Sequence, residues 1–284
     1  MPNVEHVAFA IHSLGGGGAE RVAVFLANEM SRRGVRVDLV VLDPSGTYLP
    51  LVSPRVRIVK LGPSRVRYAV PALVRYLKTF EPQFFVSAVL HMNLATSIAW
   101  QWSQVPTRLI LTETMNPAEH RTRTIYLRFR LAYAVAPFLY RRASQVVAVS
   151  EGAATAAAKV YGLRVDQLRA IPNPVLPDDW EKLAQEPVEN DWFSGDGPPV
   201  VLAAGRLVPQ KDFGNLIRAF TILRRHIDAR LVILGEGPER AKLETLISAA
   251  GLRESVSLPG VVTNPIRFMA RANAFVLSSL HEGM

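Results

Sequence analysis

The sequence of 284 residues contains no cysteine. This absence excludes disulfide bonds, a thiolate nucleophile and a zinc site with thiolate ligands, and it suits a cytoplasmic protein. Asp-X-Asp triplets are also missing, and we expect no catalytic metal and no cofactor. No run of about 18 uncharged apolar residues occurs, so we expect no membrane span. The first residues lack the basic and apolar regions of a signal peptide, and we expect none.

The composition is globular, with 49% hydrophobic and 20% charged residues, and the length fits two domains of roughly 100–200 residues each. Charge is unevenly distributed. Residues 1–175 carry 21 Lys and Arg against 10 Asp and Glu, a net charge of +11, whereas residues 176–284 carry 12 against 14, a net charge of −2. This asymmetry predicts a partner that contacts only the first part. No nucleic-acid-binding signature is present, so we expect an anionic membrane surface and no nucleic acid.

Short apolar runs alternate with helical patterns along most of the chain, which predicts parallel sheets with right-handed crossovers. Ser150 is a good N-cap for a helix that Gly162 would end. Residues 173–197 are rich in proline and acidic residues and are interpreted as an interdomain linker. We therefore predict an α/β protein with a first domain over residues 1–172 and a second over residues 198–284. Its last apolar run, Ala274 to Leu277, is predicted to be a buried strand.

Three loops between a predicted strand and a predicted helix have residues that suit a ligand site. The sequence HSLGGGGAER places Gly15, Gly16, Gly17 and Gly18 where backbone N–H groups would approach a ligand; a tight structural turn is an equally good interpretation. The sequence AAGRLVPQKDF places Arg206 and Lys211 at a strand end and a helix start, where two cations would grip a diphosphate. The alternative for Arg206 and Lys211 is a pair of solvated surface charges. The sequence LVILGEGPER places Glu236 at another strand end, as a ligand-binding or a helix-capping residue.

Together, these stretches resemble a known family. GRLVPQKDFGNLIRAF, LVILGEGPERAKLETL, GLRESVSLPGVVTNP and FVLSSLHEGM are similar to the C-terminal domain of family 4 glycosyltransferases. GGGGAERVAVFLANEMSRRGVRVDLV and VSEGAATAAAKVYGL resemble the acceptor domain of the same family. The resemblance implies the GT-B architecture of two Rossmann-like domains and a retaining transferase. Such an enzyme would move a sugar from a UDP-linked donor to a lipid- or glycan-linked acceptor in surface polysaccharide synthesis. It would work as a peripheral protein on the cytoplasmic face of the membrane.

The resemblance also implies roles for individual residues. Arg206 and Lys211 would hold the diphosphate of the donor and, in place of a metal, stabilise charge on the leaving group. Glu282 would be the first carboxylate of the E-x7-E motif and would bind sugar hydroxyls. The second carboxylate of the motif would lie beyond the last residue. We therefore expect the second domain to be incomplete and this chain alone to be inactive. The remaining donor-binding positions are Gly15, Gly16, Gly17, Gly18, Gly205, Glu236, Val261, Val262, Gly283 and Met284.

One segment departs from the family pattern. Many members carry a histidine after the strand that matches RLILTE, and here the segment reads TETMNPAEH. Glu113 is therefore the candidate for contacting sugar or acceptor, followed by Asn116 and His120. His12 and His91 also lie at predicted strand ends, where a hydrogen-bonded structural histidine is the more frequent case.

The arginine-rich stretch over residues 121–143 is predicted to be helical, with Pro137 kinking or ending the helix. Tyr126, Phe129, Tyr133 and Val135 would face lipid, although a helix packed on the core with a basic outer face deserves equal weight. Two functional alternatives stay open: a nucleotide-sugar epimerase of the same fold, and an inactive module that binds sugar nucleotides.

Overall fold

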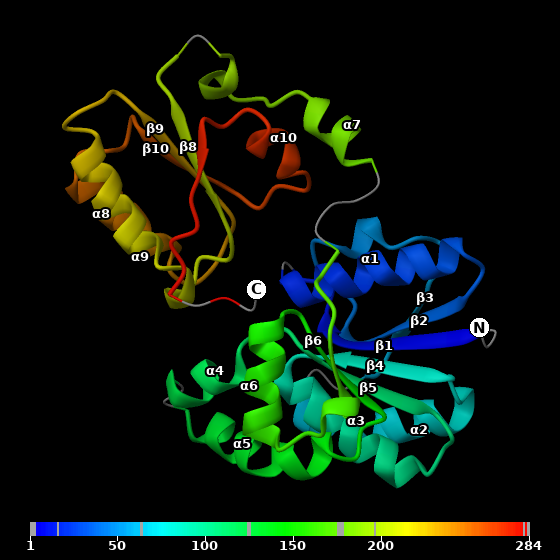
Figure 1. Ribbon diagram of the computed structural model, residues 1–284. Coiled ribbons are helices and arrows are strands. Elements are labelled where there is room, and N and C mark those ends of the chain that lie inside the picture. The colour runs from blue at the N-terminus through cyan, green and yellow to red at the C-terminus, as the bar shows by residue number, and fades with distance from the viewer. Residues whose placement is uncertain are drawn as a thin grey trace. The chain divides into compact units, whose positions relative to one another are not determined.

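The computed structural model describes residues 4–15, 17–62, 65–123, 126–174, 179–195, 197–280 and 282. The chain divides into two compact units, the first built mainly from residues 1–174 and the second from residues 175–281 (Figure 1). None of the helices in these described ranges is long and apolar enough to span a bilayer.

The first unit contains a seven-stranded parallel sheet in the order β3-β2-β1-β4-β5-β6-β7. Its strands are β1 (His6–Ser13), β2 (Arg36–Asp43), β3 (Arg57–Lys60), β4 (Phe84–Ala88), β5 (Arg108–Glu113), β6 (Gln145–Ala148) and β7 (Leu168–Ala170). Its helices are α1 (Gly18–Arg32), α2 (Val70–Phe80), α3 (Leu90–Ser103), α4 (Pro117–Arg123), α5 (Leu127–Tyr140) and α6 (Glu151–Tyr161). The chain builds outward from β1 in one direction and then restarts at β4 in the other, so the topological switch point lies between β1 and β4.

Both faces of this sheet are buried, as the continuous apolar strands predict. Phe9 and Leu39 pair across β1 and β2 and pack under α1, while the alternate residues Ala8 and Val40 belong to the cluster under α2 and α3. Figure 1 shows α1 on one face and α2 and α3 on the other. The prediction of a doubly wound parallel sheet is confirmed for this unit.

Two helices test the capping and proline predictions. α6 begins after Ser150, whose hydroxyl accepts a hydrogen bond from the backbone N–H of Ala153 at 3.2 Å, and ends at Gly162 in the left-handed conformation. Of the two outcomes predicted for Pro137, the end of the helix does not occur, because α5 continues to Tyr140, and the kink stays a prediction. Leu139 and Tyr140, beyond the proline, are buried in the core, and this packing outweighs the roughly 3 kcal/mol cost of an internal proline.

The second unit contains a four-stranded parallel sheet in the order β10-β9-β8-β11. Its strands are β8 (Val200–Ala204), β9 (Arg230–Leu234), β10 (Val256–Gly260) and β11 (Ala274–Phe275), and its helices are α7 (Trp180–Gln185), α8 (Phe213–Leu223), α9 (Arg240–Ala249) and α10 (Ile266–Met269). One face packs against α8 and α9, and the other against α10 and the segment that contains Phe193. Short 3₁₀ helices in the connections of the two units are η1 (Leu49–Leu51), η2 (Val66–Tyr68), η3 (Val165–Gln167), η4 (Asp191–Phe193) and η5 (Pro209–Lys211).

The segment predicted to be a linker is largely part of the second unit. Within residues 173–197, α7 packs against α10, where the side-chain amide of Asn264 donates to the carbonyl of Leu183 at 2.8 Å and Arg271 donates to the carbonyl of Ala184 at 2.9 Å. The proline and acid content concealed this helix, because the contacts that hold it come from residues about 80 positions later.

The final strand also differs from the prediction. β11 spans only Ala274 and Phe275, and both residues are exposed, as is Leu277. Among the described strands, β11 pairs with β8 alone and lies at the edge of the sheet. The prediction that residues 274–277 form a buried strand is therefore wrong.

A buried carboxylate ties together three elements of the first unit. Asp38 in β2 is fully buried and accepts hydrogen bonds from Arg57 at 2.8 Å and from Tyr76, and its Oδ2 lies 2.9 Å from Nε2 of His6. Burial alone would raise the pKa of Asp38, but the hydrogen bonds from Arg57, Tyr76 and His6 outweigh it and hold the pKa below its usual value. The cluster lies at the amino ends of the strands, opposite the ligand-binding edge, and its role is stability.

We expect Asp38→Asn to lower the free energy of unfolding by about 2–4 kcal/mol near neutral pH, because Arg57 and Tyr76 lose the carboxylate that pairs them. A lowered pKa stabilises the fold above the unfolded value of about 3.9, so the difference from wild type should shrink as pH falls below that value. Urea unfolding as a function of pH measures both effects. Asp166→Asn, which breaks an exposed pair with Arg164, should cost less than about 1 kcal/mol; equal losses in the two variants would contradict the assignment.

Candidate functional site

The carboxyl edge of the second sheet brings together several of the predicted donor-binding residues. Arg206 is exposed in the loop after β8, and no described side chain pairs with it. Lys211 lies at the end of η5, directly before α8. Its aliphatic stem packs on Gly205, where an added Cβ would lie 3.2 Å from Cε of the lysine. The strand end and the helix start thus present two cations from one short loop.

The segment after β11 is bonded to this loop. The hydroxyl of Ser278 donates to the carbonyl of Lys211 at 2.7 Å, and the backbone N–H of Leu280 donates to the carbonyl of Gln210 at 2.9 Å. Glu282 is half-buried and follows two residues later. The structure therefore brings Ser278 and Leu280 against the loop of Arg206 and Lys211. The predicted contact of Glu282 with the donor stays a prediction, and Gly283 and Met284 lie outside the described residues.

The loops after β8 and β9 approach each other too closely for a side chain between them. Gly235 has a φ of +135°, and a Cβ at this position would lie 2.0 Å from the carbonyl oxygen of Gly205. The N–H of Leu207 donates to the carbonyl of Glu236, and the N–H of Glu239 donates to the carbonyl of Leu207, at 2.9 and 3.0 Å. Glycine at position 235 is therefore required for the position of the Arg206 loop.

Glu236 has a local partner in the structure. Its carboxylate accepts from Arg240 at 2.6 to 3.0 Å, and this hydrogen bonding lowers the pKa of Glu236. Arg240 also donates to the carbonyl of Leu258 in β10 at 2.9 Å. Val261 and Val262 follow β10, the first exposed and the second half-buried. The predicted donor contacts of Glu236, Val261 and Val262 stay predictions.

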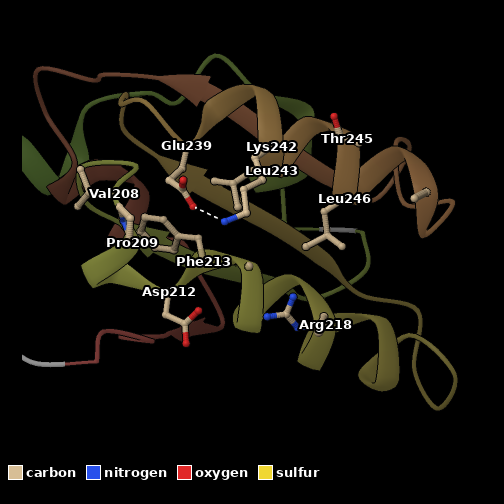
Figure 2. Close-up of a pocket in the computed structure, with 12 residues that line it drawn as sticks. Val208, Pro209, Asp212, Phe213, Arg218, Glu239, Lys242, Leu243, Thr245 and Leu246 are labelled. Atoms are coloured by element: carbon tan, nitrogen blue, oxygen red, sulfur yellow. Dashed lines mark hydrogen bonds and ion pairs between the residues drawn. The ribbon is translucent and has the colours of Figure 1, made fainter. Parts of the chain in front are cut away.

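A cavity of about 390 Å³ lies between α8 and α9, lined also by Val208 and Pro209 (Figure 2). Figure 2 shows Glu239 and Lys242 paired at its rim, with their charged groups 2.9 Å apart. The described residues that line it include none of those predicted to bind the donor. The predicted donor site is therefore the open loop edge and not this cavity.

In the first unit, the glycine-rich loop follows β1 and precedes α1. Gly46 has a φ of +140° and packs against the base of this loop, where a Cβ would lie 2.2 Å from the carbonyl oxygen of Leu14. The N–H of Tyr48 donates to the same carbonyl at 2.9 Å. Gly15, Gly17 and Gly18 are thus held at the carboxyl end of β1; Gly16 lies outside the described residues.

Two histidines meet at the switch point of the first sheet, a feature that sequence reasoning undervalued. His12 at the end of β1 and His91 in the first turn of α3 lie edge to face with ring centroids 5.8 Å apart. Nδ1 of His12 is buried without a hydrogen-bond partner among the described residues. Val89, between β4 and α3, has a φ of +74°, a strained value for a β-branched residue. The sequence feature that could have identified this pair is the position of each histidine at the end of a predicted strand.

Glu113, the candidate for contacting sugar or acceptor, is buried at the end of β5. The hydroxyl of Tyr140 donates to its carboxyl, and the side-chain amide of Asn93 donates to that hydroxyl at 2.8 Å. Burial raises the pKa of Glu113 to about 7, and the hydrogen bond from Tyr140 limits the rise. Only 6% of Glu113 is exposed, so in this conformation its carboxyl contacts the helices that cover the sheet and not solvent. A ligand role for Glu113 stays a prediction.

The two weaker candidates also have local partners. The side-chain oxygen of Asn116 accepts from the backbone N–H of Ala118 at 3.1 Å, at the start of α4. Nδ1 of His120 lies 2.9 Å from the hydroxyl of Tyr133. Both residues lie near Glu113 along the chain, and their predicted contact with an acceptor is not tested by these bonds.

We expect Glu113→Gln to change how stability depends on pH. Because its pKa is raised, Glu113 keeps its proton in the folded protein at pH values where it has lost it in the unfolded chain. The free energy of unfolding therefore falls as pH rises from about 4.5 to about 7, by up to roughly 3 kcal/mol in total. In the glutamine variant, the free energy of unfolding measured with urea should not show this fall between about pH 5 and about pH 8. Glu151→Gln, at an exposed position in α6, should leave the wild-type pH dependence; an unchanged slope in the Glu113 variant would contradict the raised pKa.

Comparison with known proteins places the chain in a family. The model of Glycosyltransferase Family 4 matches residues 16–179, and the model of Glycosyl transferases group 1 matches residues 185–284. An uncharacterized glycosyltransferase of Methanocaldococcus jannaschii is 30% identical over 181 residues, which are 63% of this chain and 44% of that protein. The chain thus spans less than half the length of that relative.

A second relative aligns along almost the whole chain. The N-acetylgalactosamine-N,N'-diacetylbacillosaminyl-diphospho-undecaprenol 4-alpha-N-acetylgalactosaminyltransferase of Campylobacter jejuni is 26% identical over 99% of this chain and 76% of its own length.

Solved structures share the fold. HepE of Anabaena, in complex with UDP and glucose, superposes with a TM-score of 0.75 at 20% identity, over 97% of this chain and 74% of that one. The sucrose-phosphate synthase of Thermosynechococcus elongatus gives a TM-score of 0.75 at 18% identity, over 99% and 77% of the two chains. With two parallel α/β units and a family model that covers more than half of its residues, the chain belongs to Glycosyltransferase Family 4 and has the GT-B fold.

Proposed function

We propose that the protein transfers a sugar, with retention of configuration, from a UDP-linked donor to a lipid- or glycan-linked acceptor. The observation that carries this proposal is the carboxyl edge of the second sheet, where the segment after β11 is bonded to the loop of Arg206 and Lys211. In parallel α/β sheets this edge is where ligands bind. The chain's membership of a glycosyltransferase family supports the same reaction.

In the proposed reaction, Arg206 and Lys211 bind the diphosphate of the donor. Charge builds up on the leaving diphosphate as the bond to the sugar breaks, and preformed cations stabilise that charge without reorganising. Because Gly205 has no side chain, the donor can approach its backbone closely. Glu282 binds hydroxyl groups of the sugar. We propose that these two cations fulfil the role that a metal ion has in other transferases. UDP is the proposed leaving group because HepE was solved with UDP and glucose.

The acceptor half of the proposal rests on the names of relatives. The Campylobacter jejuni relative acts on a diphospho-undecaprenol-linked sugar, and two Rhizobium meliloti relatives are lipopolysaccharide core biosynthesis glycosyltransferases. We therefore propose a lipid-linked acceptor and a location on the inner face of the membrane. The glycine-rich loop and the histidine pair at the switch point of the first sheet are the proposed contacts of the first unit.

We expect Arg206→Ala and Lys211→Ala each to cost about 2–4 kcal/mol of transition-state stabilisation, because each removes a charge that the leaving diphosphate requires. The measurement is kcat/KM for transfer from radiolabelled UDP-sugars to extracted lipid-linked acceptors, made on a version of the protein extended to the length of its relatives. Arg225→Ala, which removes an exposed cation just beyond α8, should retain wild-type kcat/KM. Near-wild-type values for both site variants would contradict the diphosphate assignment.

We expect the products to identify the reaction. Mass spectrometry after incubation with a panel of UDP-sugars should show the acceptor enlarged by one hexose-type residue, together with UDP, and EDTA should not reduce the yield. Free UDP with a C2-epimerised sugar would instead support an epimerase. Binding of UDP-sugars without turnover would support an inactive module.

A further inference from the structure

Helix α5 has an outward face that no described part of the first unit covers. Leu127, Leu131, Val135 and Phe138 are 68%, 60%, 50% and 58% exposed, and their spacing of three and four residues places them along one stripe. Tyr126, just before the helix, is 56% exposed. Four large apolar side chains in a row on one helix exceed the scattered exposure that is normal for a protein surface.

The opposite face of α5 is already used by the core. Tyr133, Ala136 and Tyr140 are buried in the cluster that includes α3 and Tyr161 of α6. Tyr133, which the sequence suggested as lipid-facing, is therefore on the inner face, and Phe129 is only partly exposed. From Leu131 to Tyr140 the helix carries no charged residue. A helix that is apolar on both faces is normally buried on both, which indicates that the outward face has a partner.

Charge around the stripe indicates what that partner is. Arg130 on α5 and Arg142 just beyond it are exposed, and the guanidinium of Arg142 lies 3.6 Å from the ring centroid of Phe138. No Asp or Glu occurs between Glu119 and Glu151. A second copy of the chain would bring arginines against arginines with no acid to pair them, whereas anionic headgroups above an apolar layer complement both features.

We propose that α5 docks the protein on an anionic membrane surface. Leu127, Leu131, Val135 and Phe138 enter the boundary between headgroups and acyl chains, and Arg130 and Arg142 bind the headgroup phosphates. The helix lies in the plane of the membrane, because its 14 residues extend only about 21 Å against a hydrocarbon core of about 30 Å. This inference deepens the proposed function, on which it rests for its biological sense, by naming the surface that meets the membrane of the acceptor.

Sedimentation of the full chain with vesicles tests the proposal. We expect binding to vesicles of phosphatidylcholine mixed with phosphatidylglycerol, little binding to phosphatidylcholine alone, and weaker binding as NaCl increases. Leu131→Ser combined with Phe138→Ser should lower the partition coefficient by tenfold or more, roughly, because two apolar side chains no longer enter the lipid. Arg130→Glu should lower it by about fivefold or more on the anionic vesicles.

Matched controls come from the second unit. Ile222 and Ile227 are 58% and 47% exposed, so Ile222→Ser combined with Ile227→Ser makes the same chemical change away from α5 and should leave binding unchanged. Since all these positions are exposed, thermal unfolding should match wild type in every variant. Equal losses in the α5 and control variants, equal binding to neutral and anionic vesicles, or no binding would overturn the proposal. A dimer that Leu131→Ser abolishes, without vesicle binding, would identify a second copy as the partner and would also overturn it.

The vesicle assay contains neither donor nor acceptor, so its outcome is independent of sugar transfer. Transfer without vesicle binding would refute the docking surface alone. Vesicle binding by the chain, with no sugar transfer from any donor by a version extended to the length of its relatives, would refute the proposed function alone.

Discussion

The contact between Gly235 and Gly205 is the constraint on which the candidate donor site depends. The carbonyl of Gly205 occupies the space that a side chain at position 235 would need, so the loops after β8 and β9 meet backbone to backbone. This contact fixes where Arg206 leaves the sheet and gives the stem of Lys211 a flat surface to pack on. Ser278 and Leu280 then add the segment after β11 to a loop that is already held. The site is thus built from backbone geometry first and charged side chains second.

Much of this arrangement was predictable because its signals are local. Arg206 and Lys211 lie in a short segment that contains a strand end, a glycine and the start of a helix, and this local pattern is enough to place them at a carboxyl edge. Ser150 and Gly162 mark the two ends of α6 through local signals of the same kind. The bonds between the loop and Ser278 were not predictable, because they join residues 67 positions apart. The spacing of apolar residues predicts the helices and strands. The loop contacts that align these elements depend on residues far away in the sequence.

Several differences between the expected and the observed local structure share a physical cause, which is that tertiary packing overrode a local signal. Pro137 fails to end α5 because Leu139 and Tyr140 are buried beyond it. The acidic and proline-rich segment before β8 forms α7 because Asn264 and Arg271 bind its carbonyls. Glu113, at the strand end where a ligand contact is predicted, is covered by Tyr140 in this conformation, and the ligand contact stays a prediction. In each case the deciding contact comes from an element that the local sequence does not contain.

Tyr140 connects Glu113, the candidate ligand-binding residue, with the helix that carries the proposed docking surface. Its ring is buried within α5, while its hydroxyl bonds Glu113 at the carboxyl end of β5. The helix with the exposed apolar stripe is therefore anchored to the sheet edge at which parallel α/β folds bind ligands. A displacement of α5 toward a surface would have to break a buried hydrogen bond to a carboxyl whose pKa is about 7, which costs more than the loss of an exposed one. The anchoring favours docking of the first unit as a rigid body, with the position of Glu113 relative to α5 unchanged by the lipid.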